Sequence, residues 1–219
     1  IKITRDEFNK PQGSPPYKDK EFLASTDEWF LPCNLYTAPD GTLWVVDMYF
    51  GLLQHKAYMT TYLRKQYASR GLDKPKLSTG RIYRVRYTKN KASTVPKLEG
   101  LSASSLLKFL THPNGLTRDT AQRLIVESAD SSVVNALIKL ASASSKPLGQ
   151  IHALWTLDGL DCATEKALIP ALKSSTPDVI NTALDIIAIR RLSDPTIVTS
   201  IKVSAPSLLQ ELAKRLSSS

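Results

Sequence analysis

The chain has little cysteine and no long apolar run, and each shortage excludes a class of protein. Its 219 residues include two cysteines, Cys33 and Cys162. They lie in segments that we expect to belong to different domains, so geometry disfavours a disulfide, and without CxxC spacing they form neither a metal nor a haem site. We expect both to be small buried hydrophobic side chains. No stretch approaches the roughly 18 apolar residues of a membrane-spanning helix, which excludes a membrane span.

Acidic residues are outnumbered, with 20 Asp and Glu against 29 Lys and Arg, and the formal net charge is +9. The basic residues are scattered along the chain and form no block. A scattered excess is typical of a solvated basic surface, and no motif for nucleic-acid recognition is present. We therefore expect no nucleic-acid partner.

Residues 32–58 are the most informative stretch and predict a β-hairpin. Two apolar runs, CNLYTA and TLWVVDM, flank Pro39-Asp40-Gly41. Proline fixes φ for a turn, Asp bonds nearby backbone through its side chain, and Gly accepts a positive φ. Asp47 and Tyr49 follow the second strand, and His55 comes shortly after. The hairpin thus delivers polar side chains to one end of a sheet.

The segments around the hairpin are expected to complete a first domain over residues 1–90. Residues 11–20 have the composition of a surface loop, and residues 50–79 that of a helical insertion in which Gly71 supplies a C-cap. Residues 80–87, GRIYRVRY, alternate apolar residues with arginine, which is typical of a strand near a sheet edge.

Beyond a linker at residues 91–100, glycine becomes rare and the apolar period becomes helical. We expect helices near 103–112, 117–128, 131–143, 147–159, 163–174, 177–191, 195–203 and 206–217. Prolines 147, 177 and 206 recur at spacings of 30 and 29 residues, each in the first turn of an expected helix. A repeat of this length with two helices predicts a HEAT-type α-solenoid over residues 101–219.

The segment EFLASTDEWFLPCNLYTAPDGTLWVVDMYFGLLQHKAYMTTYLRKQYASRGL, followed by GRIYRV, resembles the last blade of a bacterial propeller family. These proteins are labelled membrane-bound or PVC-type dehydrogenases, and their propeller is similar to quinoprotein dehydrogenases of the glucose/sorbosone type. The segments HPNGLTRDTAQRLIVE and HALWTLDGL resemble the HEAT-like repeats that follow the propeller in the same proteins. The resemblance covers residues 20–160.

The resemblance implies an α+β multidomain fold, in which a partial β-propeller precedes an α-solenoid of HEAT-like helix pairs. It implies that a complete propeller holds the quinone cofactor PQQ and Ca²⁺ on its axis, oxidises a sugar-like alcohol, and passes electrons to a c-type cytochrome domain. We expect this chain, which opens on IKITRDEF, to be a C-terminal fragment of a bacterial periplasmic or secreted protein. The remaining blades would come from the same protein or another chain, and the fragment would not be catalytic by itself.

Two departures from the family pattern leave an alternative open. Leu31 and Phe50 stand where the family has arginine, and no CxxCH haem motif is present. Because arginine is a forked, permanent cation, its loss weakens the binding of an anionic cofactor or substrate. The alternative is a propeller and solenoid that serve as a non-catalytic binding or structural scaffold.

Asn34, Asp47, Tyr49 and His55 are the candidate residues of the axial pocket. Asp47 is interpreted as a general base, a calcium ligand or a backbone cap, and the cap is favoured because Asp at a strand end commonly bonds nearby backbone. His55 matches the family's Gln-His pair, again with a structural role favoured. Asn34 and Tyr49 are expected mainly to satisfy buried backbone groups. No residue is assigned as catalytic, metal-ligating or haem-binding.

Three further expectations concern packing. Arg118 and Asp119 should form a salt bridge to a neighbouring helical repeat. Trp155 should pack in the helical core. Trp29 and Trp44 should belong to the core between propeller blades.

Overall fold

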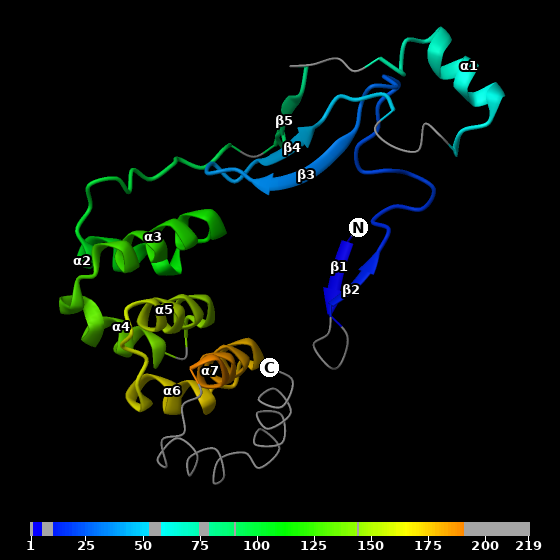
Figure 1. Cartoon of the computed structure of the whole chain (residues 1–219). Coiled ribbons are helices and arrows are strands. Elements are labelled where there is room, and N and C mark those ends of the chain that lie inside the picture. The colour runs from blue at the N-terminus through cyan, green and yellow to red at the C-terminus, as the bar shows by residue number, and fades with distance from the viewer. Residues whose placement is uncertain are drawn as a thin grey trace. The chain divides into compact units, whose positions relative to one another are not determined.

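The computed structural model describes residues 2–5, 11–52, 58–74, 79–89, 91–143 and 145–190 (Figure 1). The chain divides into two compact units, residues 1–94 and 95–219. His55 and the helices expected at 195–203 and 206–217 lie outside the described residues.

A short antiparallel hairpin opens the first unit. Strand β1 (Lys2–Arg5) pairs with β2 (Pro11–Ser14), and Arg5 lies opposite Pro11. The prediction of a surface loop is therefore wrong for residues 11–14. Pro11 lacks an N–H, but proline is tolerated as the first residue of a strand, so Pro11 does not prevent β2 from pairing with β1.

A three-stranded antiparallel sheet follows, in the order β3-β4-β5. It consists of β3 (Pro32–Thr37), β4 (Leu43–Asp47) and β5 (Arg81–Val85). This confirms the predicted hairpin and the predicted edge strand, because β5 pairs with β4 alone among the described strands. Gly41 has the expected positive φ, +79°, in the turn between β3 and β4.

The two faces of this sheet carry different side chains, because residues paired across strands point to the same side. Leu35, Val45 and Tyr83 share one face, and Val45 is 1% exposed. The opposite face carries six residues, of which two, Asn34 and Arg84, are polar. We call the four others the outer apolar face. They are Tyr36, Trp44, Val46 and Ile82.

Helix α1 (Thr61–Ser69) occupies the region predicted to be a helical insertion. Thr60 caps its start by accepting a hydrogen bond from the N–H of Leu63 at 3.3 Å, and Gly71, with a φ of +69°, follows its end as predicted. No residue of α1 is buried. The helix is attached through Tyr67, which packs against a small cluster of Trp29, Tyr49 and Leu72.

The second unit is helical, and its bounds agree with the predicted ones to within a few residues. Its elements are α2 (Ala103–Leu106), η2 (Leu107–Thr111), α3 (Gly115–Ser128), η3 (Ser131–Val133), α4 (Val134–Ala141), α5 (Pro147–Gly159), α6 (Glu165–Leu172) and α7 (Pro177–Ile189). Pro147 and Pro177 each open a helix, as predicted. No helix among the described residues has the length and apolar character needed to cross a bilayer.

These helices pack in sequence around one apolar core (Figure 1). Helix α5 contacts α3, α4 and α7, while α6 contacts α4 and α7. The residues six, seven and ten positions after Pro147 and Pro177 line this core, with exposure of 1% or less. They are Ala153, Leu154, Leu157, Ala183, Leu184 and Ile187. These contacts between helices bury the apolar side chains that a single helix would leave in water.

Two glycines of this unit lie at close contacts between neighbouring elements. A Cβ placed on Gly149 would lie 2.6 Å from Cγ2 of Thr111, and one on Gly159 would lie 2.7 Å from Cγ2 of Val126. Since real Cβ atoms essentially never approach other atoms so closely, these positions join neighbouring elements only without a side chain.

The two cysteines differ in their surroundings. Cys162 is partly buried against the helical core, and the structure places no disulfide between it and Cys33. Cys33 is exposed, so the prediction that it is buried is wrong. It lies on edge strand β3, every residue of which is exposed, and the sequence of a strand does not reveal whether another strand covers it.

Candidate functional site

Asp47 is held as a backbone cap at the end of β4. It is 1% exposed, and its Oδ1 accepts hydrogen bonds from the N–H groups of Leu31 and Tyr49, both at 2.8 Å. Oδ2 is buried and has no hydrogen-bond partner among the described residues. The two bonds tie the chain entering β3 to the chain leaving β4. This is the geometry expected of the favoured structural role.

Tyr49 is packed and hydrogen-bonded rather than presented to a ligand. Its ring centroid lies 6.0 Å from that of Trp29, and the guanidinium carbon of Arg81 lies 3.6 Å from the ring centroid. A hydrogen bond with Asp27 is the main cause that raises the pKa of the Tyr49 phenol above its usual value. The phenol therefore stays protonated near neutral pH and cannot act as a base there.

Asn34 lies apart from Asp47. It pairs with Val46, whose side chain points to the opposite side of β4. Its amide donates to the Tyr36 hydroxyl at 3.0 Å, and its Oδ1 accepts from the N–H of Leu35 at 2.8 Å. The structure thus brings Asp47 and Tyr49 together and does not bring Asn34 to them.

Those predicted residues that the structure describes, Asn34, Asp47 and Tyr49, do not form a calcium site by themselves. Calcium binds about six to eight oxygen ligands, which are supplied by carboxylates, carbonyls and water. Within the described part of the chain, no group of three or more His, Cys, Asp or Glu side chains is placed to hold a metal ion. Asp47 offers one unengaged oxygen, Oδ2, which is too few for such a cage.

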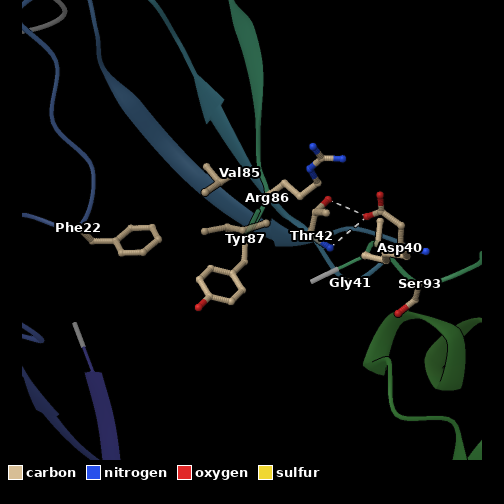
Figure 2. Close-up of a pocket in the computed structure, with 11 residues that line it drawn as sticks. Phe22, Asp40, Gly41, Thr42, Val85, Arg86, Tyr87 and Ser93 are labelled. Atoms are coloured by element: carbon tan, nitrogen blue, oxygen red, sulfur yellow. Dashed lines mark hydrogen bonds between the residues drawn. The ribbon is translucent and has the colours of Figure 1, made fainter. Parts of the chain in front are cut away.

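The opposite end of β4 borders a pocket that the sequence did not predict. Its volume is about 370 Å³, and Figure 2 shows Phe22, from a separate segment, facing Val85 and Tyr87 across it. Ser93 donates its N–H to the carbonyl of Asp40 at 2.9 Å, which fixes one side of the pocket.

Asp40 is an ionised structural residue in this pocket. Its Oδ1 accepts from the N–H of Thr42 at 3.0 Å and from the Thr42 hydroxyl at 2.7 Å, and its Oδ2 pairs with Arg84. The bonds from Thr42 are the main cause that lowers the pKa of Asp40 below its usual value. The carboxylate is thus engaged in holding the turn and is not available as a base.

A second pocket, of about 520 Å³, lies on the same face of the sheet. Its lining includes Phe22, Leu23 and Leu35. Phe22 lines both pockets, so the segment around it covers this face only in part. The sequence offered one signal for this contact, the apolar pair Phe22-Leu23 inside an otherwise polar stretch.

Three residues of the outer apolar face are exposed. Tyr36 is 55% exposed, Trp44 37% and Ile82 65%. An antiparallel sheet with one face in water normally carries polar residues on that face. Neighbouring aromatic and β-branched side chains on an exposed sheet face mark an interaction surface.

The helical unit has a polar cluster that joins neighbouring helices. Arg118 of α3 donates from Nε to Nε2 of His152 on α5 at 3.0 Å, so Nδ1 carries the imidazole proton and donates to Gln122 Oε1 at 2.8 Å. Nδ1 lies 4.0 Å from Oδ1 of Asp119. Arg118 also donates to the carbonyl of His112 at 2.7 Å. Arg118 therefore joins α3 to a neighbouring helix, but through a hydrogen bond to His152 and not through the predicted salt bridge.

Burial is the main cause that lowers the pKa of His152 below 6.5, and the positive charge of Arg118 lowers it further. Asp119 opposes both effects. The predicted packing of Trp155 is confirmed as partial burial against the core, and Trp29 is buried within the first unit.

Residues 2–89 match the family model described as a domain of unknown function, DUF7133. The matched range lies within the first unit, residues 1–94. No curated protein matches the chain, and no solved structure does either.

Proposed function

We propose that the first unit is a structural part of a larger β-sheet assembly and has no catalytic activity by itself. By resemblance, the assembly is the propeller of a quinoprotein-like sugar or alcohol dehydrogenase, and this chain contributes a C-terminal blade followed by HEAT-like repeats. The outer apolar face, Tyr36, Trp44, Val46 and Ile82, is the observation that supports the proposal.

The area exposed on this face would contribute part of the surface that an association buries. A tyrosine or tryptophan buries 150–250 Å² when fully covered, so covering the exposed fractions of Tyr36, Trp44 and Ile82 removes on the order of 300 Å² from water. At about 25 cal/mol per Å², this contributes roughly 7 kcal/mol before the cost of association. A second sheet packed face to face would cover the patch.

The bonding of the candidate residues supports the absence of catalysis in the isolated chain. Oδ1 of Asp47 is engaged by two N–H groups, and the Tyr49 phenol has a raised pKa. Leu31 and Phe50 supply no charge where the family has arginine. In this proposal PQQ, calcium and a cytochrome partner belong to the complete assembly, in the periplasm or outside the cell.

An activity assay tests the catalytic part of the proposal. The purified chain is mixed with PQQ, Ca²⁺, a redox dye and a panel of sugars and alcohols. We expect no substrate-dependent reduction of the dye. Reduction by the chain alone, abolished by Asp47→Ala, would show a self-sufficient catalyst and overturn the proposal.

A sedimentation experiment tests the structural part. We expect the chain to self-associate with rising concentration, and the triple variant Tyr36→Thr, Trp44→Thr, Ile82→Thr to be monomeric, because Thr keeps strand propensity and removes apolar area. The control variant, Leu116→Ala, Leu148→Ala, Ile189→Ala, changes three exposed apolar residues of the helical unit and should behave as the wild type. Equal behaviour of both variants would contradict a role for the sheet face.

A non-catalytic binding or structural scaffold is the second candidate function, because Leu31 and Phe50 replace the family's arginines. It predicts that the complete assembly, loaded with PQQ and Ca²⁺, also lacks substrate-dependent dye reduction. Activity of the loaded assembly would exclude the scaffold and leave the dehydrogenase proposal standing.

A further inference from the structure

We propose that Asn114 is a site of non-enzymatic deamidation and that Arg118 controls the rate of this modification. Asn114 directly precedes helix α3 and is partly exposed. Of the six asparagines in the chain, Asn114 alone is followed by glycine. Because glycine has no Cβ, the main-chain nitrogen of Gly115 is less shielded, and its backbone less restricted, than at the residues that follow the other asparagines.

The reaction needs no partner other than water. The main-chain nitrogen of Gly115 attacks Cγ of Asn114 and loses its proton, a new N–C bond forms, and the bond from Cγ to Nδ2 breaks. The amide nitrogen leaves as ammonia with that proton, and a five-membered succinimide ring remains in the chain. Water then opens the ring at one of its two carbonyl carbons. The product is aspartate, or iso-aspartate, in which the main chain runs through the former side-chain carbonyl.

The folded backbone holds Asn114 in an unreactive conformation. Ring closure requires the Gly115 nitrogen to lie beside Cγ in an attacking geometry. At the observed ψ of 123°, this nitrogen points away from the Asn114 side chain. The side chain is itself engaged, because its Oδ1 accepts a hydrogen bond from the N–H of Leu116 at 2.9 Å and so caps the helix. Deamidation therefore requires the first turn of α3 to open.

Arg118 opposes this opening. Its Nη1 donates to the carbonyl of His112 at 2.7 Å and to that of Pro113 at 3.0 Å, so it ties the chain before the cap to the first turn of the helix. Hydrogen bonds from a charged donor are roughly twice as strong as neutral ones. Nη2 lies 3.4 Å from the position that a Cβ on Gly115 would occupy. The same side chain thus contacts the chain on both sides of Asn114.

The two products differ in their effect on α3. Aspartate keeps an acceptor at the cap and places a negative charge at the helix N-terminus, where it is favourable. Iso-aspartate lengthens the main chain by one carbon atom, which displaces the carboxylate from the cap position. Because Arg118 also donates to His152 of α5 at 3.0 Å, loss of the cap would loosen a contact between two helices.

Mass spectrometry of the full chain, incubated at pH 7.5 and 37 °C, tests the proposal. Trypsin cleaves after lysine and arginine, and the fragment that follows Lys108 contains Asn114 as its sole asparagine. The conversion of amide to carboxyl in this fragment is measured over time, with unincubated protein as the blank. Arg118→Ala is compared with Arg123→Ala, which removes an equal charge from the same helix and whose ion pair with Glu127 is exposed.

We expect Asn114 to convert at least tenfold faster than Asn135, which precedes alanine within α4. Unfolding the wild type in urea should accelerate the conversion of Asn114 by roughly tenfold, because a helix end opens more easily than the whole domain but is closed most of the time. Arg118→Ala should accelerate it by about fivefold or more, since two hydrogen bonds that hold the closed state are lost. Arg123→Ala should change the rate less than twofold.

Three results would overturn the proposal. They are an equal rate for Asn114 and Asn135 in the folded chain, an equal rate for Asn114 in the folded and the unfolded wild type, and an equal rate for Asn114 in the two variants.

Hydrogen exchange provides a second measurement, because Arg118→Ala also removes the bond to His152 and could unfold the helical unit. The amide of Leu116 should exchange faster in this variant, while the amide of Ile125, whose side chain is fully buried, should keep its wild-type rate. Unchanged exchange at Leu116, or equal acceleration at both amides, would contradict local control of the cap by Arg118.

Discussion

Acidification should loosen the contact between α3 and α5 by protonating His152. The side chain is 13% exposed and neutral, and its Nε2 accepts a hydrogen bond from Arg118. A protonated imidazole has no acceptor, so it faces the Arg118 guanidinium as a second cation. The folded state thus binds this proton less readily than the unfolded chain does, in agreement with the lowered pKa.

The sign and size of the effect follow from the geometry. Folding lowers the pKa of His152. The contribution of the neutral imidazole to the free energy of unfolding is therefore complete above the unfolded pKa, 6.5, and is lost as the pH falls through the folded pKa. Repulsion by Arg118 is offset in part by Asp119, whose Oδ1 lies 4.0 Å from Nδ1. What remains is at least the lost hydrogen bond, about 1 kcal/mol, which corresponds to a fall of about 4 °C in Tm for a domain of roughly 100 residues.

Thermal unfolding of the wild type and of His152→Gln at pH 7.5 and pH 5.0 measures this effect. Glutamine retains an acceptor for Arg118 and does not titrate, while the remaining titrations are common to both proteins. We expect the wild type to lose about 4 °C more than the variant on acidification. An equal loss, or an NMR spectrum that places the neutral imidazole proton on Nε2, would refute the reasoning.

Three substitutions test other parts of the structure. Gly149→Ala places a Cβ 2.6 Å from Cγ2 of Thr111, so we expect a loss of about 1–3 kcal/mol in chemical denaturation. Arg190→Ala removes the ion pair with Asp158, and because the pair is partly exposed the loss should be about 1 kcal/mol. Asp47→Ala removes the acceptor of two N–H groups and should cost about 2–4 kcal/mol, seen as faster hydrogen exchange in the first unit only. A change below about 0.5 kcal/mol at Gly149 or Asp47 would contradict the packing or the cap, respectively.

Local patterns predicted much of the fold because their causes are local. The turn at Gly41 and the start of α5 at Pro147 depend on backbone angles that those residues favour. The helical period placed Leu154 and Leu184 in the core, and both are fully buried. Such features require no knowledge of distant parts of the chain.

Contacts between distant segments could not be predicted in the same way. Arg118 and His152 are 34 residues apart, and no periodic signal links a cation to a neutral histidine. Cys33 appeared buried because an apolar strand does not reveal that it lies at an edge. At the candidate site the sequence suggested that Asp47 and Asn34 act together, but strand alternation places them on opposite sides of the sheet.

Hydroxyl-radical footprinting of the outer apolar face tests the central claim most directly. The oxidation of Tyr36, Trp44 and Ile82 is measured by mass spectrometry in the purified chain and in the protein isolated from its native cells. The account predicts that these side chains react readily in the purified chain and are protected in the native protein. Equal reactivity in the two preparations would show that no other sheet covers this face and would contradict the account.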